Sequence, residues 1–232
     1  MIRKRISHWR QKFYEWLYAM SAKRCRRYHL DQHPRKWSNA QLRKLAPLFQ
    51  GEVVNVSAYK DIDKENGHYR NYFTAASHYS LTNYWGSNCP NDGHPDALFL
   101  DLDAPLPESM KQRFDVVFNH TVLEHVFGIE QAVKNLCEMS RDVVVTVVPF
   151  MQQEHYSSGL YGDFWRFTPL GLKQLMQQNG FEVVYLSAND TSLYPIYIVM
   201  VASSRPDFWK ARLPEGFSSD NRIGSRLFHL AD

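Results

Sequence analysis

The continuous β-branched run at residues 143–148 (VVVTVV) constrains the fold more than any other segment of this 232-residue chain. Valine and threonine favour extended backbone, because their branched Cβ restricts the side chain in a helix. A strand with one solvated face alternates apolar and polar residues, whereas this run is apolar at nearly every position. The segment therefore predicts a central strand of a mostly parallel sheet that helices cover on both faces.

Six further segments have the composition of strands: residues 53–56, 79–83, 97–100, 115–119, 182–186 and 196–202. Helical patterns occupy residues 129–140 and 168–179. The second pattern begins with Thr168 as N-cap and Pro169 at the first helical position, and Gly180 follows its end. This order predicts an α/β fold with an open, mostly parallel, seven-stranded sheet. In such sheets ligands bind beyond the carboxyl ends of the strands, so the residues after each strand are the candidates for function.

The basic residues of the chain are concentrated at its start. Residues 1–36 contain eleven Lys and Arg and two acids, a net charge of +9, while the remainder carries a net charge of −6. Between residues 2 and 22 apolar side chains recur at helical spacing and form one stripe, made of Ile6, Trp9, Phe13, Leu17 and Met20. Pro34 and the polar residues 36–39 suggest a break in the chain, and a second helix is expected after it at about residues 39–49. We therefore predict a basic helical head at residues 1–50, a main domain at 51–202 and an aromatic-containing tail at 203–232.

Three interpretations of this basic head stay open. In the first, its apolar stripe packs against the main domain and its charges form a solvated face. In the second, the stripe binds outside the chain, either in the headgroup layer of an anionic membrane or on a protein partner. Nucleic-acid binding is the least favoured, because no nucleic-acid-binding module accompanies the charges.

Other classes of protein fit the chain poorly. Cys25, Cys89 and Cys137 are an odd number at irregular spacing, which fits neither a disulfide framework nor a zinc site. No apolar stretch approaches the ~20 residues of a membrane-spanning helix. No charged segment followed by an apolar one opens the sequence, so we expect no signal peptide. We expect a cytoplasmic protein without a metal, with a peripheral position at the membrane as the alternative.

Three segments together resemble class I S-adenosylmethionine-dependent methyltransferases. They are residues 114–126 (FDVVFNHTVLEHV), residues 143–150 (VVVTVVPF), and residues 163–175 (DFWRFTPLGLKQL) with NGFEVV at 179–184. The third is similar to a subgroup found near polysaccharide and glycan biosynthesis. The resemblance implies a Rossmann-like sheet whose seventh strand is antiparallel, with S-adenosylmethionine as cofactor and a small-molecule or glycan-type acceptor.

The resemblance also implies where the cofactor binds, and there the sequence departs from the family. The family has a glycine-rich turn after the first strand, but here Ser57, Tyr59 and Asp61 stand where glycines are expected, and Asn55 stands at the usual acid. An acid normally holds the ribose after the second strand, and that place falls to Asn83. Asp101 and Leu102 after the third strand do match the family, and the resemblance implies that they contact the adenine. His120 after the fourth strand is a further candidate for binding the cofactor.

Two functional interpretations follow from this departure. The protein binds the cofactor in a modified turn and is an enzyme, which is the one we favour. Alternatively, it keeps the fold, has lost the cofactor, and acts as a non-catalytic methyltransferase-like protein that binds a protein partner or a membrane surface.

The acceptor side is expected in the segment after the fifth strand. His155 is the candidate general base, because the subgroup pattern often has a histidine shortly after Val-Pro-Phe. The candidate acceptor-binding residues are Tyr161, Asp163 and Arg166, with a loop-ordering ion pair between Asp163 and Arg166 as the alternative. Glu124 lies on the turn after the fourth strand, where a carboxylate could serve as a base, and bracing of the following helix is its alternative role. We interpret His125 as bracing that helix, and Trp165 and Phe167 as core.

Overall fold

A computed structural model describes residues 11–21, 34–85, 93–189 and 197–214 of the chain. The chain divides into two compact units, Met1–His33 and Pro34–Asp232. In the first unit, residues 11–21 form a helix that contains Phe13, Leu17 and Met20 of the predicted stripe, whereas Ile6 and Trp9 lie outside the described residues. No helix in the described ranges has the length and apolar character needed to cross a bilayer.

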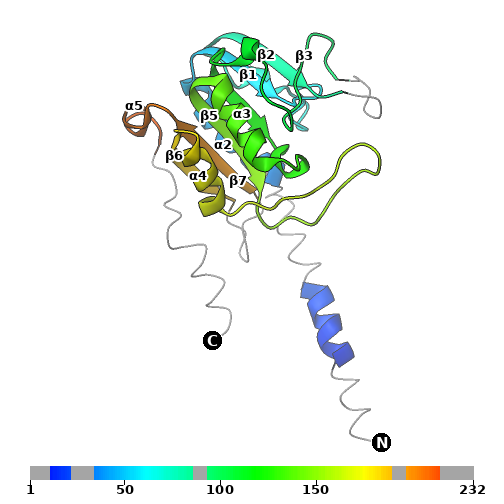
Figure 1. The fold of residues 1–232 in the computed structure, drawn as a ribbon. Coiled ribbons are helices and arrows are strands. Elements are labelled where there is room, and N and C mark those ends of the chain that lie inside the picture. The colour runs from blue at the N-terminus through cyan, green and yellow to red at the C-terminus, as the bar shows by residue number, and fades with distance from the viewer. Residues whose placement is uncertain (1–10, 22–33, 86–92, 190–196, 215–232) are drawn as a thin grey trace, which may run out of the picture. The chain divides into compact units, whose positions relative to one another are not determined.

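The second unit is built on one seven-stranded sheet (Figure 1). Its strands are β1 (Gly51–Val56), β2 (Ala76–Asn83), β3 (Leu98–Phe99), β4 (Phe114–His120), β5 (Ser140–Pro149), β6 (Glu182–Ala188) and β7 (Tyr197–Ser203). The strand order is β3-β2-β1-β4-β5-β7-β6. The pairs among β1 to β5 are parallel, and β7 runs antiparallel to both β5 and β6. The predicted open sheet with an antiparallel seventh strand is confirmed.

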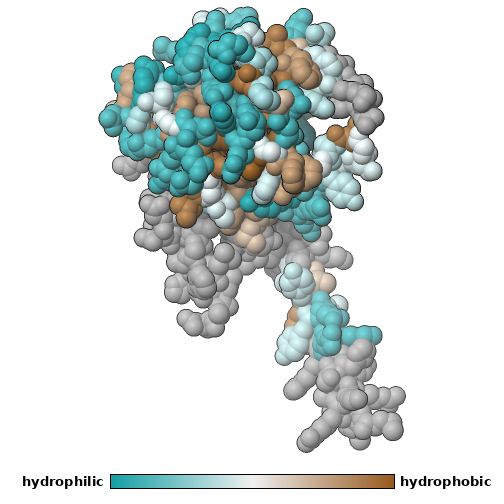
Figure 2. All heavy atoms as spheres, viewed as in Figure 1, coloured by the Kyte–Doolittle hydropathy of each residue, from teal (hydrophilic) through white to brown (hydrophobic). Residues whose placement is uncertain are grey.

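Helices cover both faces of this sheet, as predicted. On one face α3 (Ile129–Met139) and α4 (Pro169–Gln178) lie in front of the strands in Figure 1 and bury Leu136 and Met176 against Val117 and Val144. On the other face α2 (Pro34–Leu45) and the short α5 (Pro206–Lys210) join a second cluster. The outer surface on the side seen in Figure 2 is mostly hydrophilic, which is consistent with two internal cores.

The α2 helix begins earlier than the sequence indicated and belongs to the second unit. Its first residue is Pro34, whose fixed φ suits the first turn of a helix, although we expected proline to break the chain there. It continues into the turn η2 (Ala46–Leu48), and Leu42, Leu45 and Phe49 are fully buried beneath it. The division between the units therefore falls between His33 and Pro34 rather than near residue 50.

The caps of α4 confirm the pattern read from its sequence. The Thr168 hydroxyl accepts a hydrogen bond from the backbone N–H of Gly171 at 3.1 Å, and Pro169 is the first helical residue. Gly180 follows the helix with a φ of +80°, in the left-handed region that favours glycine.

The C-terminal segment begins inside the core rather than as a separate tail. The Trp209 side chain of α5 packs edge-on against Phe49, with 5.2 Å between ring centroids. Its indole N–H donates to the Asp142 carboxylate at 2.8 Å. The tail predicted from residue 203 thus starts as part of the fold, and residues 215–232 lie outside the described residues.

The connection between β1 and β2 contains no α-helix. A crossover between parallel strands usually passes through a helix, but residues 57–75 form turns and one short helical turn, η3 (Tyr69–Asn71). Asn39 of α2 anchors this connection, because its side-chain amide donates to the Asp63 carbonyl at 2.9 Å and to the Glu65 carboxylate at 2.8 Å. The α2 helix and the connection between β1 and β2 are therefore in contact through Asn39.

Candidate functional site

A cavity of about 730 Å³ opens at the carboxyl ends of β1 to β4, where the topology predicts a ligand crevice. This volume falls within the usual range for small-molecule and cofactor sites. Its wall comes from the turns after these four strands and from a loop after β5. The residues that line it are Ser57, Tyr59, Asn83, Tyr84, Gly93, Leu100, Asp101, Leu102, Asp103, Val122, His125, Val126, Leu160, Tyr161 and Gly162. Six of the candidates named from the sequence are therefore brought together: Ser57, Tyr59, Asn83, Asp101, Leu102 and Tyr161.

The turn after β1 keeps a glycine-like backbone without containing glycine. Ser57, Tyr59 and Asp61 have φ values of 55°, 53° and 60°, all in the left-handed region. This region is uncommon for residues other than glycine and costs about 1–2 kcal/mol for a residue with a Cβ. These are the three positions at which the family resemblance expects glycine. The chain thus carries larger residues at these positions, and their backbone adopts the left-handed conformation that glycine adopts readily.

The end of β2 holds this turn in place. The backbone N–H of Ser57 donates to the Thr82 hydroxyl at 3.1 Å. The side-chain oxygen of Asn83 accepts from the Tyr59 N–H at 2.6 Å, and its amide nitrogen donates to the Tyr59 carbonyl at 3.0 Å. Asn83 therefore uses its oxygen and one of its N–H groups to hold the Tyr59 backbone. It lies at the predicted place in the cavity wall, but its contacts in the structure are to the turn.

Asp61 anchors the turn from below. Its carboxylate is 2% exposed and accepts hydrogen bonds from the Asn55 side-chain amide at 2.8 Å, the Tyr79 hydroxyl at 2.9 Å and the Arg70 backbone N–H at 3.0 Å. Burial and the Asp61 charge raise the pKa of Tyr79 well above its ordinary value, so the phenol stays a donor. The acid expected at position 55 is replaced by an amide, and an acid six residues later bonds directly to that amide.

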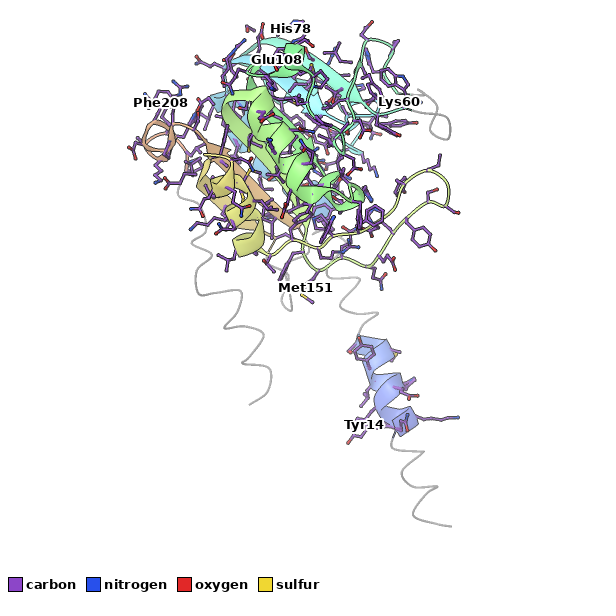
Figure 3. All side chains as sticks on the ribbon, in the orientation of Figure 1. Tyr14, Lys60, His78, Glu108, Met151 and Phe208 are labelled. Carbon is purple, nitrogen blue, oxygen red and sulfur yellow. The ribbon has the colours of Figure 1, made fainter. Side chains whose placement is uncertain are left out.

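The Tyr59 ring forms part of the cavity wall and does not fill the cavity. Its side chain is half exposed, and the Lys60 ammonium, labelled in Figure 3, lies 5.0 Å from the ring centroid. The cavity volume is present with the ring in place. The left-handed backbone at Tyr59 thus coexists with an open site.

The turn after β3 presents Asp101 and Asp103 to the same cavity. The Asp101 carboxylate accepts from the Asp103 backbone N–H at 2.9 Å, and the Asp103 carboxylate accepts from the Gly128 N–H at 2.6 Å. The first bond lies within the turn after β3, and the second joins that turn to the residues before α3. Beside them Leu100 and Leu102 are buried and supply an apolar wall. This pairing of an acid with apolar side chains suits a flat polar ring such as a nucleobase.

His125 lines the cavity, although sequence reasoning assigned it a bracing role. Its Nδ1 lies 2.6 Å from the Gly162 carbonyl oxygen, which only accepts, so Nδ1 carries the proton. Burial lowers the pKa of this imidazole, so the ring is neutral at pH 7. The signal available in the sequence was its place just after β4, at the edge where ligands bind.

Glu124 is the second residue that sequence reasoning undervalued. Its side chain is fully buried, and among the described residues neither carboxylate oxygen has a hydrogen-bond partner. Oε1 lies 3.8 Å from His125 Nε2. Burial raises the pKa of Glu124 to about 8, with the Asp163 charge contributing, so the carboxyl is largely protonated at pH 7. Its backbone carbonyl accepts from the Phe164 N–H at 2.7 Å, which ties it to the loop after β5 and not to the helix after β4.

His155 sits against a fixed carboxylate beside the cavity. Its Nδ1 lies 3.4 Å from Asp163 Oδ2, and its backbone N–H donates to the same oxygen at 2.6 Å. A carboxylate only accepts, so a proton on Nδ1 leaves Nε2 able to take one up. The ring centroid lies 4.9 Å from that of His125 and 6.4 Å from that of Tyr161, which both line the cavity.

Arg166 and Asp163 form the loop-ordering pair rather than an acceptor clamp. The guanidinium donates to both carboxylate oxygens at 2.6 Å. Its remaining donors go to the carbonyls of Gln152, Gln153 and Trp165. Arg166 thus has no donor left for an anionic acceptor, and its hydrogen bonds lower the pKa of Asp163 to about 2. As predicted, Phe167 is core, while Trp165 packs partly buried at the edge of the same cluster.

His120 is not brought to the cavity, in contrast to its expected place at the cofactor. Its side chain lies on the face of the sheet under α2, like that of Phe118 two residues earlier. Arg35 donates to its Nδ1 at 2.7 Å, and Ser38 Oγ lies 3.0 Å from its Nε2. Burial, with the Arg35 charge, lowers the pKa of His120 well below its ordinary value and keeps the ring neutral.

No protein-family model matches this sequence, and no curated protein matches it. Solved structures do match it in fold. An S-adenosylmethionine-dependent methyltransferase from Mesorhizobium loti is 12% identical with a TM-score of 0.51, covering 71% of this chain and 96% of its own. A Listeria monocytogenes protein assigned to the same class is 10% identical with a TM-score of 0.52, covering 73% and 96%.

A chain in the complex between the Haloferax volcanii Trm112 methyltransferase activator and its methyltransferase is 11% identical with a TM-score of 0.52, covering 77% of this chain and 92% of its own. The second unit therefore has the fold of class I methyltransferases, as the resemblance in sequence implied.

Proposed function

We propose that the protein is an S-adenosylmethionine-dependent methyltransferase that acts on a small-molecule or glycan-type acceptor. The observation that carries this proposal is the cavity at the carboxyl ends of β1 to β4. It joins a turn with left-handed backbone at Ser57 and Tyr59 to an acid and apolar wall at Asp101 and Leu102. Both features stand where class I methyltransferases of this fold hold their cofactor.

The residues present fit such a cofactor. The left-handed turn contributes to the cavity wall together with the Ser57 and Tyr59 side chains, and the cavity of about 730 Å³ has room for a nucleoside with an amino-acid tail. Asp101 is the acceptor for an exocyclic amine, with Leu100 and Leu102 against the ring faces. Ribose contacts fall to the remaining N–H of Asn83 and to Tyr84, without a charged partner.

His155 is the residue we assign as general base. When bound, the cofactor supplies an electrophilic methyl group, and a hydroxyl or amine acceptor loses a proton as it is methylated. Asp163 holds the His155 Nδ1 proton, and Arg166 fixes the Asp163 carboxylate in turn. With the proton on Nδ1, Nε2 is the ring nitrogen that we assign to receive the proton.

The acceptor is recognised without an anion clamp. The donors of Arg166 are consumed inside its loop, so we assign acceptor contacts to Tyr161, whose half-exposed side chain reaches the cavity rim. His125 is neutral and lines the same rim. A polar, uncharged acceptor such as a sugar hydroxyl suits these two groups.

The test is calorimetric titration of the full chain with S-adenosylhomocysteine. We expect micromolar affinity or tighter, which corresponds to about −8 kcal/mol. Absence of binding at millimolar ligand would contradict the proposal and favour a non-catalytic methyltransferase-like protein.

A matched pair of variants locates the binding. Asp101→Asn keeps the size of the side chain and removes its charge, so the affinity for S-adenosylhomocysteine should fall roughly tenfold, as expected for a charge-assisted hydrogen bond. Asp207→Asn makes the same change at an exposed position on α5 and should leave the affinity unchanged. Equal affinity in both variants would place the ligand elsewhere.

A further inference from the structure

The helix over residues 11–21 presents one continuous apolar face. Phe13, Trp16, Leu17 and Met20 follow the i, i+3, i+4, i+7 spacing of a single helical stripe, and all four are exposed, between 41% and 55%. Tyr14 lies by its spacing at one edge of this stripe and Tyr18 on the far side of the helix, and both are exposed. The Phe13 and Trp16 rings stack on each other, with centroids 6.1 Å apart.

The opposite face of the same helix is polar and weakly charged. Gln11, Glu15 and Tyr18 lie there by their spacing, Lys12 and Ala19 lie at its edge, and the Gln11 side-chain amide donates to the Glu15 carboxylate at 3.0 Å. Apolar and hydrophilic atoms stand side by side along this helix in Figure 2, and Figure 3 labels Tyr14 on it. The segment is therefore an amphipathic helix rather than a uniformly polar arm.

Within the described residues, the core clusters on the two faces of the sheet draw their members from residue 37 onward. A helix as short as the one over residues 11–21 is marginal in water by itself, because few hydrogen bonds offset the cost of nucleation. Its apolar stripe therefore needs a surface outside the unit to which it belongs.

The charges around the helix indicate what that surface is. Four basic residues precede it (Arg3, Lys4, Arg5 and Arg10) and four follow it closely (Lys23, Arg24, Arg26 and Arg27), and no acid stands in residues 1–10 or 22–30. The net charge of +9 over residues 1–36 favours an anionic surface. Tryptophan and tyrosine beside an apolar stripe are typical of helices at the boundary between lipid headgroups and acyl chains.

We propose that residues 11–21 form an interfacial helix that binds the surface of an anionic lipid bilayer. Phe13, Trp16, Leu17 and Met20 enter the boundary of the acyl chains. The basic residues on both sides of the helix meet the lipid headgroups. The methyltransferase-fold unit is thereby held next to the membrane, whether or not its cofactor site is active.

The test is flotation of the full chain with vesicles of phosphatidylcholine alone or of phosphatidylcholine with phosphatidylglycerol. We expect the protein to float with the anionic vesicles and to stay behind with the neutral ones. Raising the salt from about 0.1 M to about 1 M should lower the bound fraction, because screening weakens the headgroup attraction. Equal flotation with both kinds of vesicle would overturn the role of charge, and no flotation with either would overturn the proposal.

Two double variants of the same helix separate the apolar stripe from the charge. Phe13→Ser with Leu17→Ser should lower the partition coefficient into anionic vesicles roughly tenfold or more, because two large apolar side chains are lost from the lipid. Gln11→Ser with Ala19→Ser changes the opposite face without changing charge and should leave partitioning as in the wild type.

The size of the protein without lipid decides between a membrane and a second copy of the chain. If the wild type sediments as a dimer that Phe13→Ser with Leu17→Ser converts to a monomer, and no vesicles float it, the stripe is a contact between copies and the proposal is wrong. S-adenosylhomocysteine titration of the same variants measures the cofactor site independently of either result.

Discussion

The turn after β1 has the left-handed backbone conformation that favours glycine, although it contains no glycine. Ser57, Tyr59 and Asp61 all take left-handed φ values, and Asn83 together with the buried Asp61 carboxylate holds them. A glycine pattern cannot be recognised in a sequence where hydrogen bonds hold other residues in the same backbone conformation. The conformational requirement was visible only in the structure.

The same substitution at two of these positions should have opposite effects on stability. Ser57→Gly removes the cost of a Cβ in the left-handed region and should raise the free energy of unfolding by about 0.5–1 kcal/mol. Asp61→Gly also removes a Cβ from the left-handed region, but it leaves the Asn55 amide and the Tyr79 hydroxyl without their acceptor. It should therefore lower the free energy of unfolding by about 3 kcal/mol. Urea denaturation of both variants measures this, and a change of equal sign would refute the account of the turn.

Glu124 predicts how stability depends on pH. Its pKa rises from 4.5 to about 8 on folding, so the folded state holds a proton that the unfolded state has released between these values. The stabilisation is complete below pH 4.5 and is lost as pH rises through about 8. At ~1.4 kcal/mol per pKa unit the effect amounts to several kcal/mol.

Glu124→Gln keeps the shape of the protonated side chain and has no proton to lose. The variant should match the wild type at pH 5 and exceed its stability at pH 9, measured by denaturation at each pH. Parallel pH profiles for the two proteins would show that Glu124 is not the group responsible.

At the scale of elements, local sequence determined the helix ends better than the connections. Thr168, Pro169 and Gly180 mark α4 in the sequence because caps act within a few residues. The connection between β1 and β2 was less readable, because its support comes from Asn39 on α2 and from the end of β2. Pro34 was misread as a break for the same reason, since only packing shows that a helix follows it.

The N-cap of α4 gives a test at this scale. Thr168→Ala removes the acceptor for the Gly171 N–H and should cost about 1 kcal/mol of unfolding free energy, whereas Thr168→Ser keeps the hydroxyl and should cost much less. Chemical denaturation of both variants checks the difference. Equal losses would mean that the methyl group of Thr168, rather than its hydroxyl, supplies the stability.

At the scale of the whole molecule, the charge division in the sequence approximates a division in the structure. The basic segment coincides nearly with the unit Met1–His33, and the sheet with its two cores belongs to Pro34–Asp232. Because the cores draw on residues from 37 onward, stability and lipid binding should be separable.

Removal of residues 1–33 should therefore leave the Tm of the remaining chain within ~2 °C of the full-length value. The shortened chain should also keep its affinity for S-adenosylhomocysteine, whatever that affinity is. Thermal unfolding and calorimetry compare the two proteins, and a large fall in Tm would show that the first unit contributes to the fold.

The sequence by itself determined the class of fold, the strands of the sheet, the ends of α4 and the edge of the sheet where ligands bind. These follow from periodicity, caps and parallel topology, which are local or nearly local properties. Only the tertiary structure decided which candidates share the cavity. It places His120 under α2, pairs Arg166 with Asp163 and brings His125 to the cavity wall. It also buries the Glu124 carboxyl without a hydrogen-bond partner among the described residues. Those outcomes depend on contacts between residues far apart in the chain, and such contacts leave no spacing pattern in a single sequence.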